Sequence, residues 1–194
     1  MGEFQAGKST TLDALCDGHH ISAIGDGTAT SAVLISVSYA PEESINIRWK
    51  NKEQLTQILY RLKIFFPGFD WESFDLDVSK SREELSLLIE NLRQSGNCPK
   101  IGKADSKFIM ISHFLLKYYS SAELEQKKDA LRNVTEIPNV TRFPKKGEVK
   151  WQKSGLETFG IEEALFVFID SVECYTPSET LRRLNCIVID SPGL

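Results

Sequence analysis

The chain has 194 residues, of which 41% are hydrophobic and 26% are charged, and its formal net charge at pH 7 is -4. This composition excludes a chain that is disordered throughout, and the acidic balance argues against a nucleic-acid partner, since no long stripe of lysine and arginine is present. The four cysteines lack the spacing of a zinc site or a disulfide framework, and no run of 18 apolar residues could span a bilayer. We therefore expect a reduced, cytoplasmic protein.

The first stretch of the chain fits the phosphate-loop pattern G-x-x-x-x-G-K-S/T. In this pattern the glycines let consecutive N–H groups point at anionic phosphates, and the following helix adds the positive end of its dipole. Lys8 is expected to reach the β- and γ-phosphates, and Ser9 to place its hydroxyl on Mg²⁺. The alternative without function is a glycine-containing turn before an ordinary helix. The predicted nucleotide-binding residues are Gly2, Glu3, Phe4, Gln5, Ala6, Gly7, Lys8, Ser9 and Thr10.

A short helix and two strands are predicted after this loop. Residues 11–16 have helical spacing and end at an Asp-Gly stop. Residues 33–39 alternate as a strand, and residues 45–49 form a second strand after a proline-containing turn, so we expect a hairpin. A phosphate loop normally follows a buried strand, whereas only Met1 precedes this one, so we expect the supporting strand to be missing.

Two amphipathic helices are predicted after residue 50, where the apolar pattern changes from alternation to helical spacing. Asn51 with Gln54 resembles a capping box, and Ser81 with Glu84 resembles a second one. The apolar stripes that follow these boxes are Leu55, Ile58, Leu59 and Leu62, and then Leu85, Leu88, Ile89 and Leu92. Such stripes usually pack in a core, so we expect the helices to be structural.

Two further helices are predicted over residues 106–119 and 122–132. His113 lies among apolar neighbours of the first, where a core histidine is a better explanation than a catalytic one. Residues 135–160 contain prolines and have no clear period, so we expect an irregular connection there.

Two strands are predicted near the end of the chain. Residues 164–175 have strand character, and residues 176–179 form a turn or the start of a short helix. Residues 185–189 are nearly all apolar, as expected of a strand buried on both faces.

The last of these strands leads into a D-x-P-G motif at residues 190–193. Asp190 can hold magnesium through water, and the N–H of Gly193 can contact the γ-phosphate. Because a glycine backbone flips at little cost, that contact can report whether the phosphate is present. Alone, D-x-P-G is a common turn, but beside a phosphate loop it indicates a nucleotide site.

These motifs together resemble the dynamin-like GTPases, especially the bacterial dynamin-family proteins. The matching pieces are residues 2–15, residues 28–39 and residues 189–193. The resemblance implies an α/β fold with an incomplete P-loop NTPase core of the dynamin type. Residues 1–50 and 161–194 would form that core, and residues 51–160 would be a mainly helical insertion between switch I and the Asp190 strand.

The resemblance also implies roles for individual residues. The switch I threonine of the family, which binds magnesium and orients water, falls on Ser31 or Thr30, with Ser31 favoured by its spacing to the strand. Some family members keep a catalytic glutamine where Phe4 stands, so Gln5 is a candidate by proximity alone. The implied catalytic residues are Lys8, Gln5 and Ser31, and the implied magnesium ligands are Ser9, Thr30, Ser31 and Asp190.

The implied activity is hydrolysis of GTP with Mg²⁺, by phosphoryl transfer to water. In the intact protein the resemblance implies self-assembly and a peripheral association with a membrane surface. Two alternatives stay open: a nucleotide-binding interaction module with little hydrolysis, which Phe4 favours, and an ATP-using P-loop NTPase, because the guanine-reading N/T-K-x-D element would follow Leu194. Without its supporting strand the chain is expected to expose a sheet edge, and the isolated chain is expected to be poorly soluble or nucleotide-free.

Overall fold

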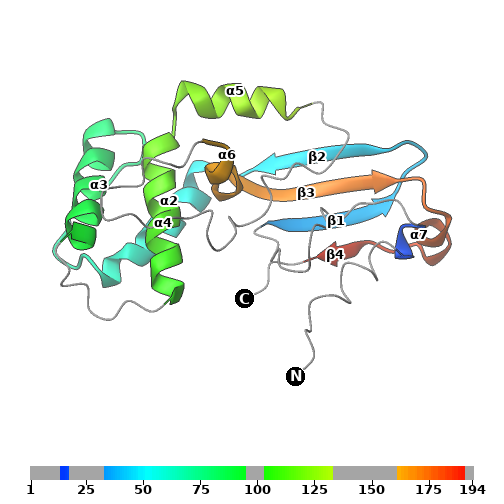
Figure 1. Cartoon of the computed structure of the whole chain (residues 1–194), viewed down its shortest axis with the longest axis horizontal. Helices are drawn as coiled ribbons and strands as arrows, with labels where there is room; N and C mark the ends of the chain where they lie inside the picture. Colours follow the sequence, from blue (N-terminus) through cyan, green and yellow to red (C-terminus); the bar gives the residue numbers. More distant parts are fainter. Residues whose placement is uncertain (1–13, 18–32, 95–102, 133–160, 191–194) are drawn as a thin grey trace. The chain divides into compact units, whose positions relative to one another are not determined.

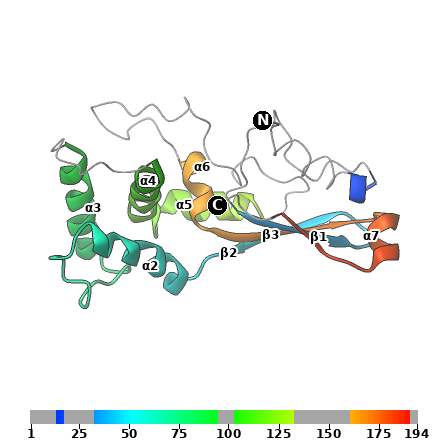
Figure 2. The ribbon, with the colours of Figure 1, turned by 90° about the horizontal axis from the view of Figure 1, so that it is seen from below.

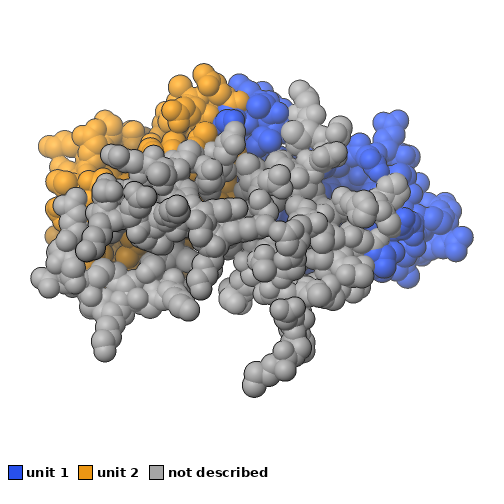
Figure 3. Space-filling view, viewed as in Figure 1, with its two compact units in different colours: residues 1–49, 127–150, 169–194 blue, residues 50–126, 151–168 orange. Residues whose placement is uncertain are grey.

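The computed structural model describes residues 14–17, 33–94, 103–132 and 161–190. It has a mixed α/β fold that divides into two compact units (Figures 1 and 3). Unit 1 consists of the described residues within 1–49, 127–150 and 169–194, and unit 2 of those within 50–126 and 151–168. Asp190 is the last residue of a strand in unit 1.

Unit 1 is built on a four-stranded mixed sheet with the order β2-β3-β1-β4 (Figure 1). The strands are β1 (Leu34–Tyr39), β2 (Ser44–Trp49), β3 (Ile169–Thr176) and β4 (Val188–Asp190). β1 runs parallel to β3 and antiparallel to β4, and β2 runs antiparallel to β3. The alternation of β1 places Ile35 and Val37 on the buried face of the sheet, as the sequence predicts.

The predicted hairpin of β1 and β2 is wrong, because β3 lies between these two strands. The four residues that connect β1 to β2 reach about 13 Å, whereas two strand spacings measure about 10 Å, so the connection can pass over a strand. The main chain joins β1 to β3 instead, and the N–H of Ala40 donates to the carbonyl of Thr176 at 3.0 Å.

The predicted strand over residues 164–175 is wrong in its first part. Helix α6 (Ile161–Ala164) and the 3₁₀-helix η3 (Leu165–Val167) come first, and β3 starts only at Ile169. Leu165, Phe166 and Val167 are all buried. A short apolar run buried on every side has no period, so its sequence pattern does not distinguish a strand from a buried helix.

The strand that ends at Asp190 is less buried than its sequence suggests. Side chains of Ile187 and Ile189 are 65% and 60% exposed, so the expectation of burial on both faces is wrong for the described residues. β4 pairs with β1 alone in the part of the sheet that the structure describes. The apolar run that ends at Asp190 therefore lies at a sheet edge, where Ile187 and Ile189 are exposed.

Unit 2 is mainly helical. Its elements are α2 (Lys52–Tyr60), the 3₁₀-helix η1 (Arg61–Ile64), α3 (Ser79–Gln94), α4 (Lys103–Tyr118), most of α5 (Ala122–Ala130), α6 and η3. Helices α3 and α4 lie beside each other (Figure 2). The capping box of Asn51 and Gln54 is confirmed, and the stripe residues Leu55, Leu59 and Leu62 are buried.

The second predicted capping box is wrong, because α3 begins at Ser79 and therefore already includes Ser81 and Glu84. The segment before α3 is fixed by ion pairs, in which Lys52 Nζ lies 2.6 Å from Asp75 and 2.5 Å from Asp77. The N–H of Arg82 donates to the carbonyl of Val78 at 3.2 Å, so the helical hydrogen bonds begin just before Ser79. His113 is buried in α4, as expected of a core residue.

Candidate functional site

Most residues of the predicted nucleotide site lie outside the described part of the chain. They are Gly2, Glu3, Phe4, Gln5, Ala6, Gly7, Lys8, Ser9, Thr10, Thr30, Ser31 and Gly193. Asp190 is described through its backbone, as the last residue of β4. The geometry near the predicted site therefore comes from the elements that flank these residues.

The register of β1 with β4 relates Asp190 to the start of β1. Asp190 lies opposite Ile35, and Val188 lies opposite Val37, so the two strands run in opposite directions. β4 consequently finishes at the end of the sheet where β1 begins. Leu34, the first residue of β1, follows the switch I candidate Ser31 by three positions in the sequence.

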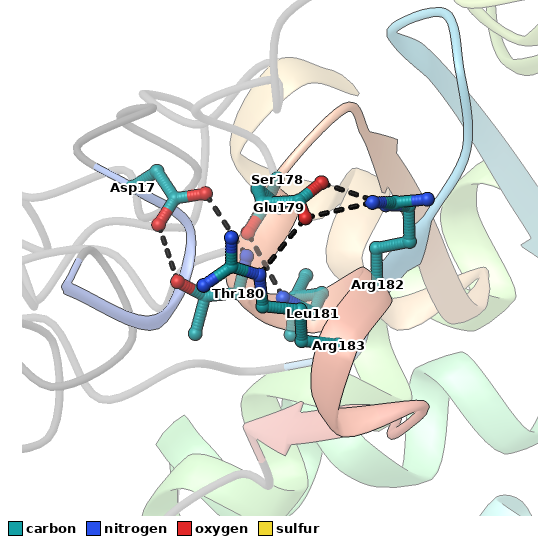
Figure 4. Close-up of polar contacts among 7 residues, drawn as sticks. All are labelled: Asp17, Ser178, Glu179, Thr180, Leu181, Arg182 and Arg183. Carbon is teal, nitrogen blue, oxygen red and sulfur yellow. Dashed lines mark hydrogen bonds and ion pairs between the residues drawn. The ribbon is translucent and has the colours of Figure 1, made fainter.

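Residues 14–17, which follow the predicted phosphate loop, contact the short helix α7 (Glu179–Leu184) in unit 1 (Figure 4). The hydroxyl of Ser178 donates to the carbonyl of Leu15 at 3.0 Å and accepts from the N–H of Leu181 at 3.1 Å. Ser178 is therefore the N-cap of α7, as expected of a short helix beginning near residue 179. Through its bond to Leu15, Ser178 also connects α7 to residues 14–17.

Asp17 completes this joint from the other side. Its carboxylate accepts a hydrogen bond from the N–H of Thr180 at 3.2 Å and another from the Thr180 hydroxyl at 2.5 Å. Two N–H groups in the first turn of α7 thus find acceptors, one from Asp17 and one from Ser178. Sequence reasoning missed this contact because its partners are 163 residues apart.

The two carboxylates beside α7 accept hydrogen bonds that lower their pKa values. Hydrogen bonds from the Thr180 side chain and then its backbone lower the pKa of Asp17 from 3.8 to about 2, so this carboxylate is ionised at neutral pH. Glu179 accepts from Arg182 and Arg183, which lower its pKa from 4.5 to about 2 (Figure 4). Arg182 and Arg183 are both exposed, and both pair locally with Glu179.

Cys16 and Cys174 are far apart in the sequence, and both are buried in unit 1. Burial, with a smaller contribution from nearby Cys16, raises the pKa of the Cys174 thiol to about 12. Cys174 is therefore a neutral thiol at physiological pH, without the thiolate that nucleophilic attack or metal binding needs. Neither Cys16 nor Cys174 is part of a disulfide bond.

Within the described ranges, no group of three or more histidine, cysteine, aspartate or glutamate side chains is arranged to hold a metal ion. The helices in that part of the chain also lack the length and apolar character needed to cross a bilayer. Comparison with known proteins finds no matching protein-family model and no matching curated sequence. The functional argument therefore rests on the motif residues and on the elements beside them.

Proposed function

We propose that the chain carries part of the GTP site of a dynamin-like GTPase, formed by the phosphate loop at residues 2–10 and the D-x-P-G motif at residues 190–193. The observation that carries this proposal is the antiparallel register of β1 with β4. A nucleotide site of this type needs a switch segment and an aspartate at the same end of one sheet. The position of Asp190 opposite Ile35, just after the switch I candidate, supports that arrangement.

The contact between residues 14–17 and α7 gives independent support. The segment that leaves the phosphate loop and the segment that leads into β4 belong to one unit and are joined by hydrogen bonds through Asp17 and Ser178. Thr10 precedes Asp17 by seven residues, a separation that would be about 10 Å along the helix predicted from the sequence. A phosphate loop that ends this close to Asp17 would share its support with the strand that leads into the D-x-P-G motif, which favours the proposal.

The exposed edge of β4 also fits the proposal. In P-loop proteins the strand before the phosphate loop is part of the sheet. A strand paired with β4 would flank the exposed side chain of Ile189 and lie near that of Ile187, and so cover part of their apolar surface. Exposed apolar side chains on an edge strand favour pairing with a further strand.

The chemistry would be phosphoryl transfer to water, in which positioning and charge neutralisation supply most of the catalysis. Magnesium, when bound, would neutralise the developing charge on the phosphate oxygens. The Lys8 ammonium would contact the β- and γ-phosphates, and the hydroxyls of Ser9 and of Ser31 or Thr30 would face the metal. Gln5 is the candidate to orient the attacking water.

The test is nucleotide binding in the full-length protein. Calorimetric titration with a non-hydrolysable GTP analogue and Mg²⁺ should show that Lys8→Ala weakens binding at least about tenfold, because a charged phosphate contact is lost. Lys80→Ala, which removes an exposed lysine of α3, is the matched control and should bind as the unchanged protein does. Equal affinities for Lys8→Ala and Lys80→Ala would contradict the proposal.

Two further measurements separate the alternatives. Competition between GTP and ATP distinguishes a GTPase from an ATP-using enzyme. Single-turnover hydrolysis distinguishes an enzyme from a nucleotide-binding interaction module, which would retain intact GTP over a long incubation.

A further inference from the structure

Unit 2 contains a pocket of about 410 Å³, a volume typical of sites for small ligands and inserted side chains. One wall is formed by the loop between η1 and α3, and the other by Ser81, Glu84 and Leu88 of α3. These helix positions recur every three or four residues and so lie on one face of α3. The loop contributes Phe66, Gly68, Phe69, Asp70, Ser73 and Phe74.

The aromatic wall of this pocket is held in shape by its own contacts. Phe69 packs edge-on against Trp71 with ring centroids 4.9 Å apart, and Phe74 lies 5.9 Å from each of these rings. The indole N–H of Trp71 donates to the carbonyl of Phe66 at 2.9 Å. Asp70 accepts hydrogen bonds from the N–H groups of Glu72 and Ser73. The pocket is therefore preformed, which lowers the cost of binding.

The charge of the pocket is negative. Its lining residues include two carboxylates, Asp70 and Glu84, and no basic side chain. The hydrogen bonds from Ser73 lower the pKa of Asp70, so its carboxylate stays ionised at neutral pH. Lys80 approaches Glu84 only to 3.9 Å and is 84% exposed, so it neutralises Glu84 weakly.

We propose that this pocket binds an arginine side chain of a partner protein, with the guanidinium between the phenylalanine rings and the carboxylates of Asp70 and Glu84. Aromatic faces attract a cation, and a guanidinium can stack on a ring while it pairs with a carboxylate. The aliphatic stem of arginine would contact Phe66 and Leu88. The site does not depend on the proposed nucleotide site, because its residues belong to unit 2 alone.

Gly68 provides a way to close the pocket. It lines the cavity, and a Cβ at this position would meet no atom within 4 Å. A side chain can therefore be added at this position without a clash at its Cβ. Gly68→Phe should obstruct the cavity, whereas Gly68→Ala should leave it open and serves as the matched control.

Trp71 reports on the pocket, because its ring contacts Phe69 and Phe74 and its indole N–H bonds to Phe66. The chain, labelled with 5-fluorotryptophan at low concentration, can be titrated with N-acetyl-arginine methylamide and observed by ¹⁹F NMR. Trp71→Phe identifies the signal among the three tryptophans. The control ligand is N-acetyl-citrulline methylamide, which has nearly the same shape as the arginine ligand and no charge.

We expect a saturable shift of the Trp71 signal with the arginine ligand and at least about tenfold weaker binding of the citrulline ligand. Glu84→Gln should weaken arginine binding about threefold, as for a partly exposed charge pair. Glu83→Gln, on the same helix but outside the pocket lining, should have no effect. Gly68→Phe should abolish the saturable shift, and Gly68→Ala should retain it.

Three results would overturn the proposal. One is equal binding of the arginine and citrulline ligands, and another is an equal effect of Glu83→Gln and Glu84→Gln. The third concerns Ile64, which is 82% exposed beside the pocket loop. If vesicles of phosphatidylserine and phosphatidylcholine shift the Trp71 signal and the arginine ligand does not, the loop binds a lipid surface instead.

Discussion

Unit 1 and unit 2 are stabilised by contacts of different range in the sequence. In unit 1 the main interactions join distant residues, such as the bond from Ser178 to Leu15 across 163 positions. In unit 2 many interactions are local, including the capping box of Asn51 and Gln54 and the turn bonds of Asp70. Several contacts of unit 2 can therefore be read from local sequence patterns, whereas the strand order of unit 1 depends on pairing between remote strands.

A charge buried in the sheet of unit 1 should destabilise the protein more than any of the other changes proposed below. Val37 is fully buried in β1, so Val37→Asp should destabilise unit 1 by about 4 kcal/mol or more, because a carboxylate would be buried without a partner. Leu34→Asp, in the same strand but 38% exposed, is the control and should cost much less. Urea unfolding followed by the fluorescence of Trp49 in β2 measures the change.

The same variant tests whether the two units are separate. With Trp49 and Trp151 replaced by Phe, the fluorescence of Trp71 reports unit 2 alone. Unit 2 should keep its native fluorescence in Val37→Asp if local contacts stabilise it. Simultaneous loss of both signals would show that unit 2 depends on unit 1.

Removal of a helix cap should destabilise the protein less than a buried charge does. The two caps differ because Asn51 bonds only to nearby residues, whereas Ser178 also bonds to Leu15, which is distant in the sequence. Asn51→Ala removes a local cap and should cost about 1 kcal/mol. Ser178→Ala removes a cap and also the long-range bond to Leu15, so it should cost about 2 kcal/mol. Chemical unfolding of both variants gives the comparison. Equal losses would mean that the bond to Leu15 contributes nothing measurable.

A decrease in pH should change the stability of unit 1 less than the substitutions above do. Asp17 has a pKa of about 2 in the folded chain and 3.8 as its reference value, and Glu179 changes from 4.5 to about 2. Because folding lowers both values, their contribution is present above about pH 4.5 and is lost as the pH falls towards 2. Asp17→Asn should therefore flatten the acid dependence of the Trp49 signal. An unchanged pH profile would exclude Asp17 as its source.

The sequence predicted those parts of the fold whose signals are local. The capping box at Asn51, the strand over β1 and the short helix start at Ser178 are confirmed. The hairpin prediction failed because the strand that separates β1 from β2 arrives more than a hundred residues later. Residues 164–168 failed because a run of buried apolar side chains has no period that distinguishes helix from strand.

The candidate site was predicted from motifs, and most of it stays a prediction. Asp190 lies at the end of a strand as expected, whereas Lys8, Ser9 and Ser31 lie outside the described residues. The joint between Asp17 and Thr180 was not predictable, because an aspartate before a glycine is an ordinary helix stop. The pocket was missed because its two walls have separate local patterns, and only folding places Phe69 near Glu84.

Because β3 lies between β1 and β2, the first two strands cannot form the sheet until β3 has been synthesised. The first two strands leave the ribosome long before their common partner, since Asn46 and Glu173 are 127 residues apart. At a translation rate of about 5 to 20 residues per second, the nascent chain waits about 6 to 25 seconds for that partner. During this interval β1 and β2 lack the strand that lies between them, and such unpaired strands with apolar side chains are prone to aggregation.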